Sequence, residues 1–179
     1  STGKLISLSE QELVDCSGSA GNQGCNGGEM QAAFSWIKSN GGLCSESAYP
    51  YKAVDGTCEK SQCTSQVTDT GYENVTPNSQ DALTAAAAQQ PVSVAVDAGG
   101  SDWQMYSGGV LTDTGCGTQL DHGVLVAGYG SSNGQDYYLV KNSWGPSWGD
   151  KGFIKLVRGS GSGKPGQCGI AMDPSYPTM

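Results

Sequence analysis

The chain of 179 residues has few basic residues, only one histidine and only two phenylalanines. Nine Lys and Arg residues face 17 Asp and Glu residues, so the formal net charge is −8 and the pI is near 4.4. This charge balance argues against a nucleic acid or an anionic membrane surface as a partner. The sequence contains no apolar run of about 18 residues, so it offers no candidate for a membrane-spanning helix.

Cysteine, in contrast, is abundant, with seven in the chain. This density is typical of disulfide bonds formed in an oxidising compartment. Zinc is the competing explanation, but it needs clustered Cys or His ligands, and the single histidine, His122, lies far in sequence from any pair of cysteines. We therefore expect no metal site and no organic cofactor. Because seven is odd, one cysteine has no partner within the chain.

The stretch from Leu120 to Gly149 has the pattern of a β-hairpin. Two apolar runs flank the pair Asn133-Gly134, which favours a tight hairpin turn. The first predicted strand begins at His122, and Asn142 follows the second. A hairpin brings the start of one strand beside the end of the next, so we expect these two side chains to be neighbours.

Each of these residues has an ordinary structural explanation. A lone histidine is most often structural, an asparagine at a strand end usually forms a turn, and Trp144, which precedes a glycine, would usually be a packing residue. Taken together, they indicate the base half of a Cys–His–Asn catalytic arrangement. The imidazole would take a proton from a thiol, while Asn142 accepts the other ring N–H. Trp144 would keep water from that bond, which is stronger in a low dielectric.

Outside the hairpin, local patterns predict several further elements. Ser9 and Glu12 form a capping box that opens a short helix towards Cys16. Apolar residues spaced i, i+3, i+4 and i+7 predict an amphipathic helix from Glu29 to Asn40 with a core-facing stripe: Met30, Ala33, Phe34 and Ile37. An alanine-rich helix over 81–89 ends before Pro91, and strands are expected at 92–96, 122–129, 137–141 and 153–157.

The two strands of the hairpin, L-D-H-G-V-L-V-A-G-Y-G and Y-Y-L-V-K-N-S-W-G-P-S-W-G, resemble the histidine and asparagine segments of papain-like, cathepsin L-like cysteine proteases. Further segments match the family in order along the chain. They are S-E-Q-E-L-V-D-C at 9–16, G-C-N-G-G at 24–28, Y-P-Y at 49–51, Q-P-V-S-V at 90–94 and C-G-I-A-M-D-P-S-Y-P at 168–177. The resemblance covers nearly the whole chain.

The resemblance implies an α+β, papain-like fold of two domains. Residues 1–73 would form a helical, disulfide-rich left domain that is incomplete at its N-terminus. Residues 74–175 would form a β-barrel-like right domain carrying His122 and Asn142, and 176–179 a C-terminal tail. The family places its active cleft between the two domains.

The resemblance also implies a cysteine endopeptidase, but the family segment that carries the nucleophile, of the C-G-S-C-W type, has no match here. The sequence contains no Cys-Trp pair, and its start, S-T-G-K-L, corresponds to a point after that segment. We therefore expect the nucleophile outside this chain and no turnover by the chain alone. Cys25, within G-C-N-G-G, matches a structural cysteine of the family.

The family's disulfide pairings carry over to Cys16–Cys58 and Cys116–Cys168, with Cys25 bonded to the absent segment. Cys44 and Cys63 match an extra pair found in some members. The active-site support residues implied are Trp144, Trp148 and Asp121, although Asp121 reads equally well as an exposed turn acid.

The implied substrate-binding positions are Gly27, Gly28, Met30, Ala95, Leu120, Gly123 and Asp173. Glycines at 27 and 28 would let an extended peptide approach the backbone closely, although simple turn geometry explains them as well. Asp173 would lie at the floor of the pocket for the P2 side chain, unless it turns outward before Pro174.

Partners implied by the resemblance are peptide or protein substrates, an inhibitory propeptide that makes the protein a zymogen, and cystatin-type inhibitors. The expected location is lysosomal, vacuolar or extracellular, and Asn74-Val75-Thr76 is a possible N-glycosylation site. Two other functions stay open. One is a non-catalytic homologue that binds or supports other molecules, and the other is a disulfide-stapled secreted binding module.

Overall fold

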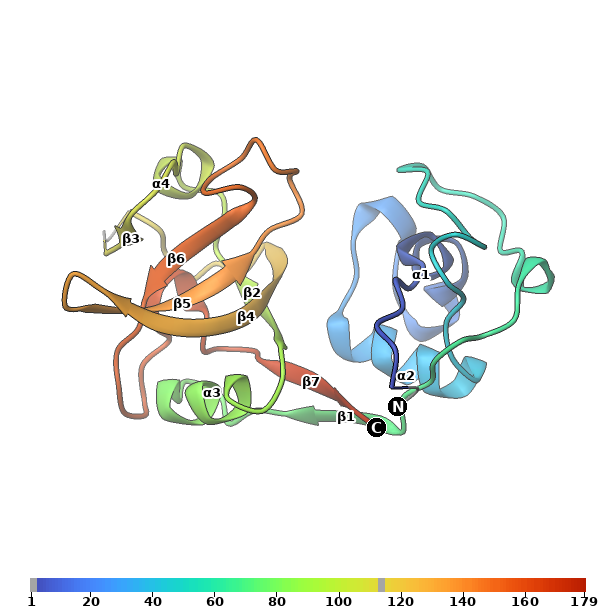
Figure 1. Ribbon diagram of the computed structural model, residues 1–179, viewed down its shortest axis with the longest axis horizontal. Helices are drawn as coiled ribbons and strands as arrows, with labels where there is room; N and C mark the ends of the chain where they lie inside the picture. The colour runs from blue at the N-terminus through green and yellow to red at the C-terminus, as the bar shows by residue number, and fades with distance from the viewer. Residues whose placement is uncertain (1–2, 113–114) are drawn as a thin grey trace. The chain divides into compact units, whose positions relative to one another are not determined.

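The protein is described here by a computed structural model covering residues 3–112 and 115–179, and the chain divides into two compact units. The first unit runs from the N-terminus to Glu73 and includes Pro177–Met179, while the second comprises Asn74–Tyr176. The first two α-helices precede all the strands, and the strands form a single, mainly antiparallel sheet, which confirms the α+β class (Figure 1). Thr70 donates its N–H to the carbonyl of Thr178 at 2.8 Å, so the last residues pair with the first unit and do not form a free tail.

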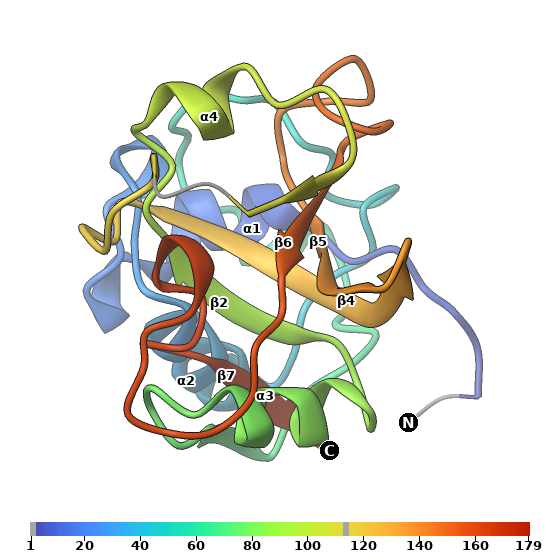
Figure 2. The same ribbon diagram turned by 90° about the vertical axis from the view of Figure 1, so that its left-hand side faces the viewer.

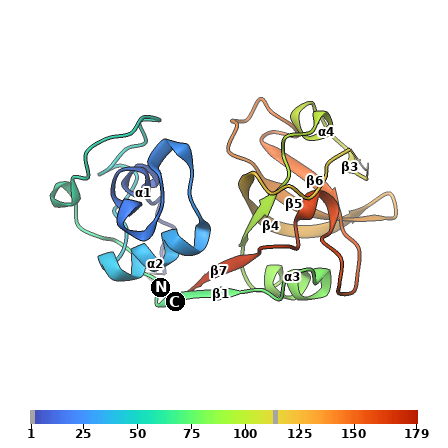
Figure 3. The same ribbon diagram turned by 180° about the vertical axis from the view of Figure 1, so that it is seen from behind.

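The first unit is built on two α-helices, α1 (Glu10–Cys16) and α2 (Met30–Asn40). Three short 3₁₀ helices join them to the loops: η1 (Ser17–Ala20), η2 (Gly24–Asn26) and η3 (Lys60–Gln62). Figure 3 shows the long connection after α2 running past α1. Side chains of α1 hold that connection by its backbone: Gln11 binds Lys52 and Val54, and Asp15 binds Gly56.

The start of α1 differs from the expected capping box. The Ser9 hydroxyl accepts the Glu12 N–H at 3.0 Å, as an N-cap should. The Glu12 carboxylate does not return to Ser9, however. It is buried and accepts the Cys44 N–H at 2.8 Å and the Asn40 side-chain amide at 3.2 Å, while the Ser9 N–H donates to the Cys44 carbonyl. A long-range bond therefore replaces the local one, and Glu12 ties α1 to the end of α2.

The core of the first unit is small and depends on Trp36. The expected stripe of α2 is only half-buried, whereas Trp36 is buried and packs with Cys16 and Leu43. Helix α2 ends where Gly41 adopts a left-handed conformation with φ 81°. The largest buried side chain of the helix therefore lies outside the stripe predicted from its spacing.

Three disulfide bonds join Cys16 to Cys58, Cys44 to Cys63 and Cys116 to Cys168, the same cysteines that the family resemblance pairs. The first two lie in the first unit and the third lies in the second. Among the described residues, the ligand atoms of Glu12, Cys44 and Cys63 lie within 4.8 Å of one another. Both sulfurs are already joined to each other, so this group offers no thiolate to a metal.

The second unit contains most of a seven-stranded sheet in the order β1-β7-β2-β4-β5-β6-β3. The strands are β1 (Gly71–Asn74), β2 (Val92–Val96), β3 (Val110–Leu111), β4 (His122–Ser132), β5 (Gln135–Lys141), β6 (Phe153–Val157) and β7 (Ser175–Thr178). Strands β2, β4, β5 and β6 pair antiparallel in that order, and β3 pairs parallel to β6. Alternate residues of β2 are fully buried, as expected when one face of a sheet covers a core.

The β4–β5 hairpin confirms the one predicted from the sequence, but both strands extend further into the turn than expected. The pairing runs from Leu125 opposite Lys141 to Ser132 opposite Gln135. Asn133 and Gly134 both have positive φ, 52° and 78°, which is the conformation that matches the twist of a two-residue hairpin.

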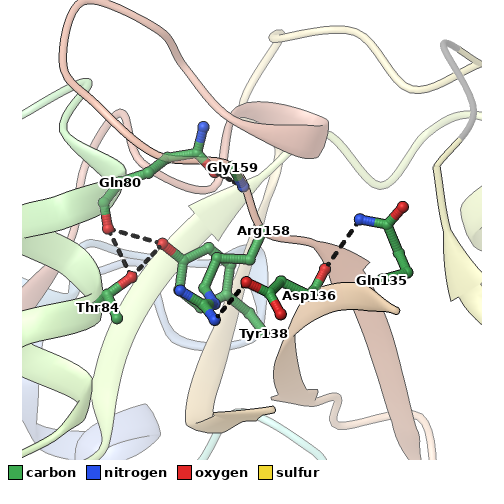
Figure 4. Close-up of polar contacts among 7 residues, drawn as sticks. All are labelled: Gln80, Thr84, Gln135, Asp136, Tyr138, Arg158 and Gly159. Atoms are coloured by element: carbon green, nitrogen blue, oxygen red, sulfur yellow. Dashed lines mark hydrogen bonds and ion pairs between the residues drawn. The ribbon is translucent and has the colours of Figure 1, made fainter. Parts of the chain in front are cut away.

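Two helices complete the second unit, α3 (Gln80–Ala87) and α4 (Ser101–Gln104). They lie at opposite ends of the unit, with the strands between them (Figures 1 and 2). Figure 4 shows how α3 is joined to the sheet. The Tyr138 hydroxyl of β5 donates to the Gln80 carbonyl at 2.9 Å and lies 3.0 Å from the Thr84 hydroxyl, while the Gln80 side chain accepts the Gly159 N–H.

No helix in the described parts of the chain combines the length and the apolar character that a bilayer crossing requires.

One buried carboxylate in the first unit is poorly accommodated. Asp69 is only 7% exposed, and neither of its oxygens has a hydrogen-bond partner within the described ranges. Burial raises the pKa of this carboxyl above its ordinary value, and the Lys38 ammonium and the nearby backbone N–H groups of Asp69 and Gly71 offset only part of the effect. A group with a raised folded-state pKa favours folding while it is protonated. That contribution is complete below the unfolded-state pKa and is lost as the pH rises through the folded-state pKa.

Replacing Asp69 with Asn should therefore remove one source of destabilisation at neutral pH. We expect the difference in Tm between mutant and wild type to become more positive from about pH 4 to about pH 8. Thermal unfolding followed by circular dichroism across this range measures the effect. The control is Glu73→Gln, because Glu73 is an exposed carboxylate nearby in sequence. A pH-independent difference for Asp69→Asn would contradict the prediction.

Candidate active site

The sheet brings His122 and Asn142 together. His122 is the first residue of β4, and Asn142 directly follows β5. Because β4 and β5 are antiparallel neighbours, the start of one lies beside the end of the other. His122 is also paired with Val96 of β2 on its other side, and Asn142 donates its N–H to the Gly152 carbonyl at 3.0 Å. Backbone hydrogen bonds therefore place both residues, independently of any contact between their side chains.

The His122 Nε2 and Asn142 Oδ1 atoms lie 2.7 Å apart. The Ser143 N–H also points at this Asn142 atom, at 2.8 Å. A backbone N–H can only donate, so the atom that receives it is the amide oxygen. An amide oxygen can only accept, so His122 Nε2 must carry the proton. In the neutral ring, Nδ1 is then left as the acceptor, and it can take a proton from a neighbouring acid.

Aromatic rings surround this hydrogen bond. Trp144 lies over the imidazole, with ring centroids 5.1 Å apart and planes inclined by 32°. Trp103 approaches almost at a right angle, at 6.3 Å and 83°. Trp148 contacts both indoles, at 5.4 Å from Trp144 and 5.7 Å from Trp103. Asn142 is buried, whereas Trp144 is 38% exposed and forms the outer side of the cluster.

Asp121 has a structural contact of its own. Its Oδ1 atom accepts the Ala98 N–H at 2.8 Å, and its N–H donates to the Val96 carbonyl at 3.0 Å. These bonds tie the residue before His122 to the loop that leaves β2. The sequence left Asp121 open as active-site support or an exposed turn acid; the residue is exposed, and its contacts are with the loop after β2.

The other predicted substrate-binding positions of the second unit lie either on the paired strands β2 and β4 or in loops outside the strands. Ala95 and Gly123 face each other across β2 and β4, and they alternate with the buried valines of both strands. Leu120 and Asp173 are half-buried, and a Cβ on Gly169 would come within 2.7 Å of Leu120 Cδ2. Gly169, in η4 (Gln167–Gly169), has φ 77°. Its left-handed conformation favours glycine, and the short distance places Gly169 directly beside Leu120.

The predicted positions of the first unit are Gly27, Gly28 and Met30. A Cβ on Gly28 would lie 2.3 Å from Asn22 Oδ1, which accepts the Glu29 N–H at 2.9 Å. Gly27 has φ 103° and open space where a Cβ would be. Local structure alone therefore requires glycine at both positions, at Gly28 by contact and at Gly27 by conformation. Met30 is half-buried at the first turn of α2.

Cys25 lacks the surroundings of a nucleophile. It is exposed and unbridged, and its backbone N–H binds the Asp55 carboxylate at 2.7 Å. Desolvation together with the Asp55 and Asp15 carboxylates raises the pKa of its thiol. A nucleophilic cysteine needs the opposite shift, because the thiolate is the reactive form.

Trp103 and Tyr106 also belong to the aromatic cluster but were not predicted from the sequence. Trp103 is fully buried between His122 and Trp148, and Tyr106 lies 6.0 Å from Trp148. The sequence feature that could have indicated them is the segment D-W-Q-M-Y at 102–106, which has two aromatic residues within a polar stretch. No spacing rule connects that segment with His122, because the contact arises only when the loop after β2 folds back.

Comparison with known proteins gives a consistent result. The profile described as "Papain family cysteine protease" matches residues 1–178. The chain is 58% identical over 178 residues to "Vignain" of Ricinus communis, covering 98% of this chain and 49% of that protein. It is therefore about half the length of this curated relative.

Solved structures show the same fold. The bromelain protease of Ananas comosus, in complex with the E64 inhibitor, superimposes with a TM-score of 0.92 at 44% identity, covering 99% of this chain and 80% of that one. The Amb a 11 cysteine protease, a ragweed pollen allergen, in its proform gives 0.93 at 44% identity, covering 99% and 54%. The comparisons confirm the papain-like fold expected from the sequence.

Proposed function

The chain belongs to the papain family of cysteine proteases, and from this we propose that the protein is a cysteine endopeptidase with His122 as its general base. The observation that carries the proposal is the 2.7 Å contact between His122 Nε2 and Asn142 Oδ1. It commits one ring nitrogen to a fixed acceptor and leaves Nδ1 for a thiol. Asn142 therefore acts by orienting the base.

The proposed reaction follows from this arrangement. A cysteine thiol gives its proton to His122 Nδ1, and the thiolate attacks the carbonyl carbon of the peptide bond. The imidazolium then returns the proton to the nitrogen of the leaving amine, and the C–N bond breaks. In the second half, His122 takes a proton from water, whose oxygen attacks the thioester and releases the acid and the thiol. No metal or organic cofactor is needed for these steps.

We place the nucleophile outside the 179 residues. Six of the seven cysteines are joined in disulfides, and Cys25 has an exposed thiol of raised pKa. The chain alone should therefore have no turnover. Its odd cysteine and the exposure of Cys25 support a fourth bridge from Cys25 to a cysteine of the nucleophile segment.

The bridge can be tested by peptide mapping of the full-length protein without reduction. We expect the three bonds described above, together with a fourth peptide pair that joins Cys25 to a segment outside the present sequence. The reduced sample is the control, because all four pairs should separate in it. A bond from Cys25 to Cys16, Cys44 or Cys63 would contradict the proposal and the assignment of the neighbouring glycines.

Substrates, inhibitors and location follow from the same proposal. Peptide or protein chains are the substrates, with Gly27 and Gly28 offering backbone to an extended peptide and Trp148 packing on the leaving-group side. Trp144 shields the hydrogen bond of Asn142. A propeptide is supported by the related ragweed protease, whose structure is that of a proform. The disulfides suit a vacuolar, lysosomal or extracellular site, where Asn74, exposed at the end of β1, would be open to glycosylation.

Removing the base should abolish the reaction. In the full-length protein we expect His122→Ala to lower kcat/KM for a peptide reporter by about 100-fold or more, the usual contribution of a general base. Alkylation of the nucleophilic thiol by iodoacetamide should slow as well, because the thiolate loses its partner. Asn142→Ala is the matched comparison and should cost less, since it disturbs orientation only. A His122→Ala protein that keeps most of its kcat/KM would exclude this mechanism and favour a non-catalytic homologue.

The P2 side chain of the substrate is proposed to meet Met30, Ala95, Leu120, Gly123 and Asp173. The first four are apolar or small, so Leu, Val or Phe at P2 should fit. Asp173 is half-buried, and it lies five residues after Cys168. A carboxylate there can form a charge-assisted hydrogen bond with Arg or Lys. The proposed specificity is therefore apolar P2 residues, with Arg also accepted.

Asp173→Ala tests this specificity. The variant should lower kcat/KM for an Arg-Arg reporter. The loss of transition-state stabilisation should be about 1–3 kcal/mol, the scale of a hydrogen bond to a charged group. The Phe-Arg reporter, which differs only at P2, is the internal control and should change little. Equal effects on both reporters would contradict a contact between Asp173 and the P2 side chain. The proposed role of His122 would be unaffected by that result.

A further inference from the structure

Trp103 is the most buried aromatic residue near His122. It is 0% exposed, although it belongs to α4, a helix of only four residues in the loop after β2. Its indole meets the imidazole of His122 at 83° with ring centroids 6.3 Å apart. Perpendicular contacts at this distance are favourable for aromatic rings.

The four rings form two tilted pairs, and the pairs meet at a steep angle. His122 and Trp144 make one pair, inclined by 32°, and Trp103 and Trp148 make the other, inclined by 30°. Trp144 and Trp148 close the arrangement at 78°. The imidazole is therefore covered on one face by the partly exposed Trp144 and bounded on another side by the fully buried Trp103.

The Asn142 hydrogen bond alone does not fix the imidazole plane. It holds one atom, Nε2, and the ring can still tilt about that point. A second contact is needed to keep Nδ1 aimed at a thiol. Trp144 is 38% exposed, so solvent reaches one side of it, whereas Trp103 is enclosed by the core of the second unit.

The backbone also couples Trp103 to His122. The Ala98 carbonyl accepts from the side-chain amide of Gln104, the residue after Trp103, at 2.9 Å. The Ala98 N–H donates to Asp121, the residue before His122, at 2.8 Å. Ala98 therefore links the residue after Trp103 to the residue before His122 through two hydrogen bonds.

We propose that Trp103 is a positioning residue that holds the His122 ring in the orientation set by Asn142. The kinetic consequence rests on the proposed function of His122, whereas the orientation of the ring does not. The indole N–H of Trp103 has no hydrogen-bond partner within the described residues. The ring itself is therefore what acts, and a phenyl ring should replace much of it without leaving a broken hydrogen bond.

The experiment uses the full-length protein with Trp103→Leu and Trp103→Phe. Trp103→Leu should lower kcat by about tenfold while KM stays within about twofold, because an aromatic contact of this kind is lost but no substrate contact is. Trp103→Phe should restore most of kcat. Trp36→Leu is the matched control: it removes an equally buried tryptophan in the first unit, so it should lower Tm but leave kcat unchanged.

A second readout does not depend on turnover. Histidine labelled with ¹⁵N reports the tautomer, and His122→Ala identifies its signal. We expect the Nε2–H form in the wild type, retention of it in Trp103→Phe and a mixture of tautomers in Trp103→Leu. Nuclear Overhauser contacts between the indole of Trp103 and the ring of His122 should appear in the unchanged protein, so the test stands even if the Leu variant does not fold.

The outcomes separate the two proposals. Absence of the Overhauser contacts, an unchanged tautomer and kcat in Trp103→Leu, or an equal loss of kcat in Trp36→Leu would overturn the role of Trp103. If His122→Ala keeps its activity while Trp103→Leu still changes the tautomer, the proposed function fails and the positioning contact stands.

Discussion

The candidate site depends on the hydrogen bond between His122 Nε2 and Asn142 Oδ1. Its 2.7 Å length requires that the start of β4 and the end of β5 stay in register over the whole hairpin. A shift of either strand by one residue would turn its side chain to the opposite face of the sheet and separate the two partners. The turn at Asn133-Gly134, the bulge after Val126 and the pairing of His122 with Val96 each oppose such a shift. The chemistry at one end of the hairpin therefore depends on the turn at the other.

The two units achieve order by different means. The second has a continuous core under its sheet, and α3 is held to β5 by the hydroxyl of Tyr138. The first has only a small apolar cluster around Trp36. It relies instead on two disulfides and on polar side chains that bind loop backbone, above all the buried Gln11 and Glu12 and the half-buried Asp15. Small cores commonly need such covalent support.

Much of this was predictable from the sequence, because strands and turns are local signals. The hairpin, the pairing of His122 with Asn142 and the amphipathic helix after Gly28 all follow from spacing. What the sequence could not supply are contacts between distant segments. Glu12 leaves its local cap for Cys44, Trp36 replaces the expected stripe as the core of α2, and Trp103 reaches His122 only through the fold of a loop. For Gly28, the sequence could not separate a substrate-binding role from a packing role. In the structure a Cβ at this position would clash with the side chain of Asn22, so packing alone explains the glycine.

The surroundings of His122 contain three buried N–H donors without an acceptor among the described residues: Asn142 Nδ2, Trp103 Nε1 and Trp148 Nε1. Each such group costs free energy, about 1–3 kcal/mol in typical proteins. A core chosen for stability alone would have used apolar side chains here. The burial of Asn142 strengthens the bond that is made, since a hydrogen bond is stronger where water is excluded. Concentrated violations of local packing rules are typical of functional sites. Other buried polar atoms without a partner among the described residues lie at Asp69 and Ser175, so the donors around His122 add to the case made by the His122–Asn142 bond and do not stand alone.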